Sequence, residues 1–305
     1  MMPESDVLPP GISEVAVLPE HHGPRTWKHL FLPDGLKQRL LNQAVFSLLH
    51  RRQLNSDRVA LQGLIVLTGP PGTGKTTAAR GLANSVARSL SSKGGTTFIQ
   101  IDPHAMPSDL LGESQRNVAQ LLGDTIPEYA ARRPYTIVMV DEVEAFAVRR
   151  SSASFETNPA DLHRATDAVL TGFDELSAKL PNVLFIVTTN FPDAVDEALL
   201  SRADIVVPFE LPDQDAILMI LRDTLDELGG RWNELRALRD DARLVEVAKV
   251  CDGLDGRQLR KLVVSAFTYR DEAALDPSSL TIDDILAAAQ DTVAGRDVLW
   301  GAAPS

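Results

Sequence analysis

One glycine-rich segment of this sequence has the residue types and spacing to hold a chain of phosphates. Residues 69–76 fit the pattern G-x-x-x-x-G-K-[ST], between an apolar run and a stretch with helical spacing. Such glycines let successive backbone N–H groups curl around a phosphate, next to the positive end of the following helix. Lys75 would reach the outer phosphates, and Thr76 would offer a hydroxyl to magnesium. The predicted binding residues are Gly69, Pro70, Pro71, Gly72, Thr73, Gly74, Lys75, Thr76 and Thr77.

Two carboxylates directly follow another apolar run, at Asp141 and Glu142. A buried strand ends this way only at a cost in free energy unless the acids have partners. Beside a phosphate-binding loop, Asp141 would hold magnesium through water, and Glu142 would orient and polarise an attacking water. The alternative is an ordinary pair of acids at a strand exit.

Asn190 ends a further apolar run, after Thr188 and Thr189. At the carboxyl edge of a parallel sheet, its amide could hydrogen-bond both the attacking water and the terminal phosphate. The alternative is an asparagine that starts a turn.

These side chains need a sheet that brings their strand ends together. Short runs rich in Ile, Val and Leu recur between helical stretches, which is typical of buried parallel strands in an α/β sheet. The predicted strands are residues 64–68, 97–101, 136–140, 183–189 and 205–209. We therefore predict a five-stranded parallel sheet flanked by helices.

The rest of the chain differs from this α/β region. Prolines are dense in residues 1–25, which predicts an extended leader, whereas the spacing from Leu36 to Leu48 predicts a helix that ends near Arg52. After Pro212 the apolar spacing is helical only. We predict four helices there, at residues 213–228, 241–251, 256–273 and 282–290. The predicted domains are a leader (1–25), a large α/β domain (26–211), a helical lid (212–295) and a tail (296–305).

Composition excludes several classes of protein. With 30 basic and 42 acidic residues the net charge is -12, which disfavours sequence-independent binding to nucleic acid. Cys251 is the single cysteine, so an intramolecular disulfide is excluded. Apolar runs fall short of the roughly 18 residues that a membrane span needs, and we expect a cytoplasmic protein.

Together these motifs resemble the AAA+ ATPases, over about residues 27–290. Residues 69–76 look like their Walker A motif and 137–142 like Walker B, while Asn190 resembles sensor 1. Arg202 resembles their arginine finger and Arg257 their sensor 2. Within that superfamily the chain is most similar to the pachytene checkpoint ATPases, which remodel HORMA-domain proteins. That similarity is carried by residues 168–171 before Asp174, 202–205 and 256–262.

The resemblance implies an enzyme that hydrolyses ATP with Mg²⁺. Arg202 would complete the site of a neighbouring copy, so hydrolysis would require a homo-oligomeric ring, expected to be a hexamer. Arg257 would contact the γ-phosphate of its own subunit and report it to the lid. The alternative for each is a surface arginine paired with a local acid, such as Asp204 or Asp255.

The resemblance also implies a protein substrate that is pulled through the ring. Leu110 and Leu111 occupy the place of the first pore loop, where the family usually carries an aromatic residue, and residues 149–163 would be the second loop. Only about 25 residues precede the ATPase module, as in bacterial relatives that accompany HORMA proteins and nucleotidyltransferases in anti-phage signalling (CBASS). The expected partner is a HORMA-domain protein bound to a nucleotidyltransferase, recruited through the leader or the pore.

Two other functions stay open at this point. Leucines instead of an aromatic side chain at the pore position would suit a nucleotide-gated binding platform that threads nothing. A general AAA+ unfoldase acting on another protein is the second alternative.

Overall fold

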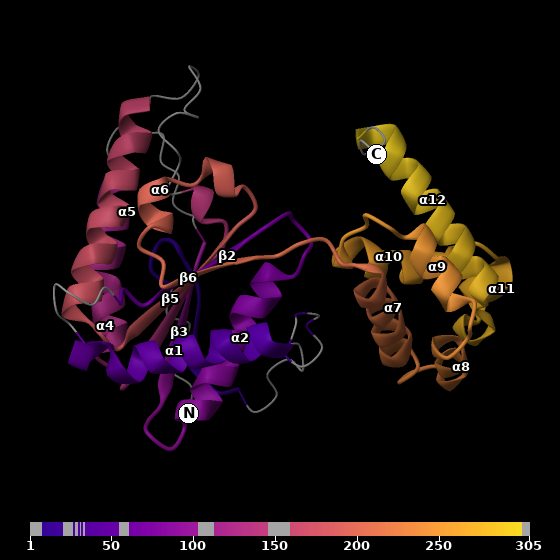
Figure 1. The fold of residues 1–305 in the computed structure, drawn as a ribbon, viewed down its shortest axis with the longest axis horizontal. Coiled ribbons are helices and arrows are strands. Elements are labelled where there is room, and N and C mark those ends of the chain that lie inside the picture. The colour runs from indigo at the N-terminus through magenta and orange to yellow at the C-terminus, as the bar shows by residue number, and fades with distance from the viewer. Residues whose placement is uncertain are drawn as a thin grey trace. The chain divides into compact units, whose positions relative to one another are not determined.

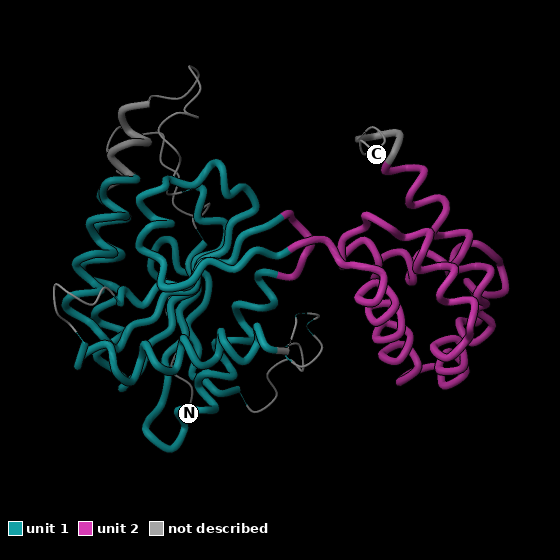
Figure 2. The backbone as a smooth tube through the Cα atoms, in the orientation of Figure 1, with its two compact units in different colours: residues 1–69, 75–209 teal, residues 70–74, 210–305 magenta. Residues whose placement is uncertain are grey.

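The runs predicted as parallel strands pair into one sheet in the computed structural model of the chain. The structure describes residues 8–20, 27, 30, 32, 34–54, 61–102, 113–145 and 159–300. These belong to two compact units, one of Met1–Gly69 with Lys75–Phe209, and one of Pro70–Gly74 with Glu210–Ser305 (Figure 2).

The sheet lies in the first unit and has six strands in the order β1-β3-β4-β5-β2-β6. Neighbouring strands run parallel except β1, which is antiparallel to β3. The strands are β1 (Ile12–Leu18), β2 (Leu64–Thr68), β3 (Thr96–Ile101), β4 (Tyr135–Val140), β5 (Val183–Thr189) and β6 (Ile205–Pro208).

The expectation of a five-stranded parallel sheet is therefore corrected to a mixed sheet of six strands. The additional strand, β1, comes from the leader and pairs along the whole of β3, from Ile12 opposite Ile101 to Leu18 opposite Thr96. Its burial pattern mixes buried, half-buried and exposed positions, as is typical of an edge strand rather than of the central strands. An ion pair of 2.6 Å between Glu14 and Arg80 of α2 (Lys75–Leu90) adds a side-chain tie.

Helices cover both faces of the sheet (Figure 1). On one face, α1 (Asp34–Leu54) and α2 share a core with Ile65 and Leu67 of β2. On the other face, the core joins Leu64 and Val66 to α3 (Glu113–Gln120), α4 (Ile126–Ala130) and α5 (Pro159–Lys179). Side chains along β2 thus alternate between two apolar layers, which explains why it reads as a continuous apolar run. A short helix, α6 (Glu197–Leu200), precedes β6.

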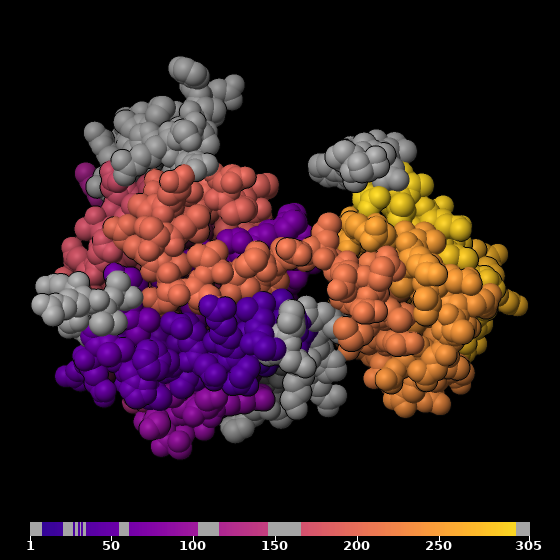
Figure 3. Space-filling view, in the orientation of Figure 1, coloured from indigo at the N-terminus to yellow at the C-terminus, as the bar shows by residue number. Residues whose placement is uncertain are grey.

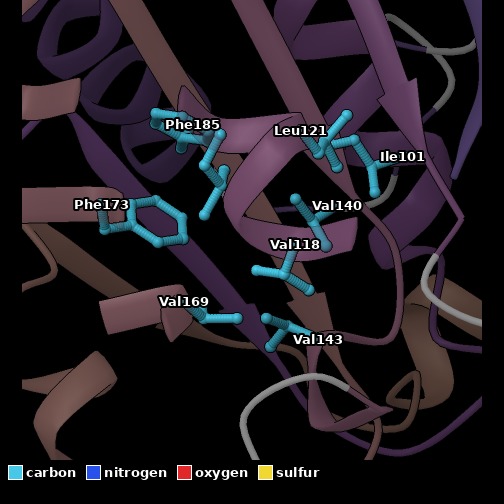
Figure 4. Close-up of a pocket in the computed structure, with 9 residues that line it drawn as sticks. Ile101, Val118, Leu121, Val140, Val143, Val169, Phe173 and Phe185 are labelled. Carbon is cyan, nitrogen blue, oxygen red and sulfur yellow. The ribbon is translucent and has the colours of Figure 1, made fainter. Parts of the chain in front are cut away.

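The core on the α3 and α5 side contains a cavity of about 20 Å³, with only apolar residues around it (Figure 4). Val118 and Leu121 border it from the helical side, Val140 from the end of β4, and Phe173 and Phe185 from α5 and β5. Because no polar group lines the cavity, a water molecule would have no partner there. Apolar packing therefore reaches directly beneath the end of β4, where the carboxylates follow.

The second unit is helical, as predicted, but it has more elements than four. The pattern expected for one helix at residues 256–273 is divided between α10 and α11. An Asp side chain caps α7 at Asp213 and α10 at Asp255, and each accepts backbone N–H bonds. The α-helices of the second unit are α7 (Gln214–Leu228), α8 (Arg236–Arg239), α9 (Leu244–Val250), α10 (Gly256–Ser265), α11 (Asp271–Leu275) and α12 (Ile282–Trp300).

The space-filling view shows the surface of one face of each unit (Figure 3). In the described part of the chain, none of the helices has the length and apolar character to cross a bilayer. Leu110, Leu111 and the segment predicted as a second pore loop, up to residue 158, lie outside the described residues.

Candidate nucleotide site

The predicted phosphate loop follows β2 directly and leads into α2. Gly69 has φ +140°, and a Cβ added there would lie 2.0 Å from the carbonyl oxygen of Phe209. Because the residue that follows β6 passes so close, only glycine fits at this position. Gly69 thus allows the start of the loop to pack closely against the sheet, and the loop turns after it.

Lys75 opens α2 and is only 5% exposed. Its Nζ donates to the carbonyl oxygen of Gly69 at 2.7 Å. Burial lowers the pKa of Lys75, and the negative charges of Glu144, Asp141 and Glu142 oppose that shift. The ammonium is therefore hydrogen-bonded to the start of the predicted loop, and the carboxylates that follow β4 favour its charged form.

Thr76 and Asp141 lie in contact, as expected for a shared metal ion. The hydroxyl of Thr76 donates to both carboxylate oxygens of Asp141, at 3.0 and 3.1 Å. A hydroxyl and a carboxylate are the hard oxygen donors that Mg²⁺ prefers, and they leave most of its shell to water and phosphate. The residues at this place fit a magnesium-bound triphosphate.

Glu142 and Asn190 also come together, from the ends of neighbouring strands. The Nδ2 of Asn190 donates to Oε1 of Glu142 at 2.8 Å. Glu142 has φ +56°, the left-handed region that non-glycine residues avoid, at a cost of about 1 kcal/mol or more. A strained residue held at a site of clustered charge is typical of a functional position.

Two further residues that contact these side chains, Thr188 and Glu144, were not predicted from the sequence. Thr188 donates its hydroxyl to Asp141 and accepts the N–H of Glu142 at 3.1 Å. Glu144 accepts the N–H of Asn190 at 3.0 Å. Strand period offered one signal, because Thr188 and Asn190 are two residues apart and lie on the same side of β5. We call Lys75, Thr76, Asp141, Glu142, Glu144, Thr188 and Asn190 the site cluster.

Arg202 lies apart from the site cluster. Its Nε and Nη2 donate to Asp174 of α5 at 2.8 and 2.7 Å, and its Nη1 donates to the carbonyl oxygen of Ala198 at 2.7 Å. The hydrogen bond to Asp174 raises the pKa of Arg202. Its partner is thus Asp174 and not Asp204, the acid considered from the sequence.

Asp204 has another role, at the amino end of β2. Its N–H donates to the carbonyl oxygen of Leu64, and its carboxylate accepts the N–H groups of Gln62, Gly63 and Leu64 at 2.7, 2.8 and 3.3 Å. The segment that carries Arg202 is therefore fixed beside the start of β2. Gly69 follows the other end of that strand, roughly 16 Å from Leu64 at ~3.3 Å per residue.

Arg257 lies in the second unit, in the first turn of α10, and is exposed. Its N–H donates to Oδ1 of Asp255 at 2.8 Å, so the acid considered as its partner caps the helix instead. Gln258 completes the capping box by accepting the N–H of Asp255 at 2.9 Å. The role predicted for Arg257 toward a phosphate stays a prediction.

A glycine loop between a central parallel strand and a helix, with an acidic strand end beside it, defines a P-loop nucleotide-binding protein. The family description "ATPase family associated with various cellular activities (AAA)" matches residues 65–211. CD-NTase-associated protein 6 of Pseudomonas aeruginosa is 41% identical over 287 residues, which cover 94% of each chain. The Homo sapiens pachytene checkpoint protein 2 homolog is 30% identical over 297 residues, 88% of this chain and 68% of its own.

The chain therefore belongs to the AAA family of ATPases, and it is similar to these two relatives. Among solved structures, a chain of the E. coli MS115-1 HORMA:CdnC:Trip13 complex is similar with a TM-score of 0.70 and 18% identity, over 91% of this chain and 94% of that one. This likeness shows a shared fold. The resemblance to pachytene checkpoint ATPases and the predicted fold class are both confirmed, with the additional strand β1.

Proposed function

We propose that the chain hydrolyses ATP at the seam between neighbouring copies of itself in a ring, expected to be a hexamer. Lys75 binds the outer phosphates, while Thr76 and Asp141 hold the magnesium ion, which neutralises phosphate charge. Glu142 orients and polarises the attacking water, and Asn190 positions Glu142 and the terminal phosphate. The contacts among these residues support their assignment to one site.

The placement of Arg202 is the observation that carries the proposal. Asp204 fixes its segment at the amino end of β2, whereas the phosphate loop follows the carboxyl end. An arginine side chain is shorter than that strand, so Arg202 serves a different copy. Asp174 and Ala198 engage three of its N–H groups, which leaves one on each terminal nitrogen for an acceptor from outside the described residues.

The proposal extends to the organisation of the chain and to its substrate. We assign residues 26–211 to the nucleotide-binding domain and 212–295 to a lid, where Arg257 contacts the γ-phosphate of its own subunit. The names of the relatives support a HORMA-domain protein, bound to a nucleotidyltransferase, as the substrate. Opening that protein in the cytoplasm would regulate anti-phage signalling, with Leu110 and Leu111 gripping a threaded segment.

A mixing experiment tests the seam. Chains with Lys75→Ala and chains with Arg202→Ala are each expected to be inactive, the second because a missing arginine finger costs about 10³–10⁵ in rate. In mixed assemblies, a Lys75→Ala subunit can supply Arg202 to a neighbour with an intact phosphate loop. Turnover should then reappear. Native mass spectrometry shows whether the mixed rings contain both chains. If they do and no turnover appears, the proposal that ATP is hydrolysed between neighbouring copies is wrong.

A second experiment tests the substrate. A HORMA-domain protein should stimulate ATP turnover and should be trapped by the Glu142→Gln ring with ATP. Absence of both effects at saturating HORMA protein would contradict this assignment while leaving the ATPase intact.

Leucines at the predicted pore position favour one other candidate, a nucleotide-gated binding platform that threads nothing. A Leu110→Ala ring decides between the two. If it hydrolyses ATP and still releases its partner at the normal rate, the platform is the better description.

A further inference from the structure

The hydroxyl of Thr188 joins two residues that the proposed mechanism uses, through one hydrogen bond to each. We propose that Thr188 is a positioning residue, which fixes the backbone of Glu142 and the carboxylate of Asp141 in their working arrangement. This inference rests on the proposed function, because it concerns the same hydrolytic site.

The register of the sheet brings these groups together. Val140 of β4 lies opposite Val187 of β5 in parallel pairing, so Thr188 comes next to Asp141 where β4 ends. Thr188 is 1% exposed, and its hydroxyl donates to Oδ1 of Asp141 while accepting the N–H of Glu142 at 3.1 Å. A single hydroxyl can be donor and acceptor at once, as this position requires.

The backbone of Glu142 needs a hydrogen bond of this kind to keep its conformation. Its φ of +56° is the one left-handed value at a non-glycine residue in the described part of the chain. A residue in this region relaxes toward negative φ unless its surroundings hold it. The bond from the N–H of Glu142 to Thr188 therefore opposes that relaxation and keeps the carboxylate within reach of Asn190, 2.8 Å away.

The carboxylate of Asp141 needs the same hydroxyl for another reason. Thr76 also donates to it, and Thr76 is itself predicted to face magnesium. Thr188 comes from the sheet and not from the phosphate loop, so it is the donor that can stay on Asp141 when Thr76 turns to the metal ion.

Bonded hydroxyls are not the rule for threonines of this sheet. The buried hydroxyls of Thr96, Thr97 and Thr136 have no hydrogen-bond partner among the residues that the structure describes. Thr136 also provides a matched control, since it lies in β4, is fully buried, and stands at the amino end of the strand, away from the site cluster.

Substitutions that separate shape from hydrogen bonding test the inference. Thr188→Val keeps the volume and the preference for a strand but removes the hydroxyl, whereas Thr188→Ser keeps the hydroxyl. We expect Thr188→Val to lower kcat by about tenfold to a hundredfold with KM for ATP within about threefold. Thr188→Ser should keep at least about half of the activity, and Thr136→Val all of it. Thr188→Ala is a second hydroxyl-free variant if the valine form does not fold.

A measurement on the nucleotide-free protein makes the test independent of turnover. Amide hydrogen exchange at Glu142 should become about tenfold faster in Thr188→Val, and stay unchanged in Thr188→Ser and Thr136→Val. Unchanged exchange and unchanged kcat in Thr188→Val would overturn the inference, and so would a loss that serine does not restore. If the wild-type chain hydrolyses no ATP, the proposed function fails, while the exchange result still decides whether Thr188 holds Glu142.

Discussion

Two polar clusters lie at opposite ends of the parallel strands in the first unit, and they are built differently. At the carboxyl ends of β4 and β5, the site cluster gathers three carboxylates around Lys75, with a strained backbone at Glu142. At the amino ends of β2 and β5, a second group surrounds the guanidinium of Arg51. We call that group, Arg51, Gln62, Gly63, Ser177 and Asp204, the anchor cluster.

The anchor cluster is closed and balanced in charge. Arg51 is 3% exposed and donates to the carbonyl oxygens of Gln62, Leu180 and Val183. Burial lowers the pKa of Arg51 to about 10, opposed by the charge of Asp204. Gly63 has φ +73°, and a Cβ there would fall 1.3 Å from Nη1 of Arg51, so glycine is required for the guanidinium to enter.

The comparison shows how a functional site can be distinguished from a cluster that stabilises the fold. The anchor cluster contains one cation and one anion, and both bind backbone atoms: Arg51 donates to carbonyl oxygens and Asp204 accepts N–H groups. The site cluster has an excess of negative charge and a strained residue, features that cost stability and are typical of a site that takes a cationic ligand such as magnesium. Changes in the first cluster should therefore affect folding, and changes in the second should affect turnover.

Within these two clusters, the largest expected effect is that of Glu142→Gln. Loss of the carboxylate that polarises water should lower kcat by about a thousandfold, equivalent to ~4 kcal/mol in activation free energy. Urea unfolding should show no loss of stability, since the change removes one of several like charges. Steady-state ATPase assays check this, with Glu175→Gln on the surface of α5 as the control. A destabilised Glu142→Gln protein would contradict the division between clusters.

The next effect is on folding. Arg51→Met should lower the free energy of unfolding by about 3 kcal/mol, because it leaves buried carbonyl groups without donors and Asp204 without a counter-charge. Urea titration measures the change, and Lys179→Met, which breaks an exposed pair with Glu175, should leave it unaltered. The folded fraction of Arg51→Met should hydrolyse ATP at close to the normal rate. A large fall in kcat with normal stability would reverse the assignment.

Glu144 tests the boundary of the site cluster. Glu144→Ala should lower kcat by about tenfold, because the N–H of Asn190 loses its acceptor and the amide loses its fixed position. Glu144→Gln retains an acceptor oxygen and should stay within about threefold of normal. Equal losses in the two variants would show that the charge of Glu144 matters rather than its hydrogen bond.

The smallest effect is expected at the edge of the anchor cluster. The hydroxyl of Ser177 donates to the carbonyl oxygen of Gln62 at 2.9 Å, an oxygen that Arg51 also serves. Ser177→Ala should therefore cost only about 0.5 kcal/mol of unfolding free energy, measured by urea titration. Ser89→Ala, on the exposed side of α2, is the matched control. A cost above about 2 kcal/mol would mean that Arg51 does not share that oxygen.

The sequence predicted the central strands and the linear motifs because each depends on a local pattern. Strands buried on both faces read as apolar runs, and the phosphate loop is contiguous. β1 escaped prediction as a sheet strand because its mixed burial depends on the pairing with β3. Thr188 and Arg51 escaped because the partners of each come from elements far apart in the chain. Nothing local marks a charged residue at the end of a predicted helix as buried.

The leader strand has a consequence for how the sheet meets other molecules. With β1 in place, β3 has an antiparallel neighbour from Thr96 to Ile101 on the side that would otherwise be a sheet edge, with a register irregularity between Ile12 and Glu14. At the opposite edge of the sheet, β6 is four residues long and includes Pro208, which has no N–H to donate. Removing the N-terminal residues through Leu18 would expose the edge of β3 and favour edge-to-edge association between chains. The leader strand therefore protects the sheet against aggregation.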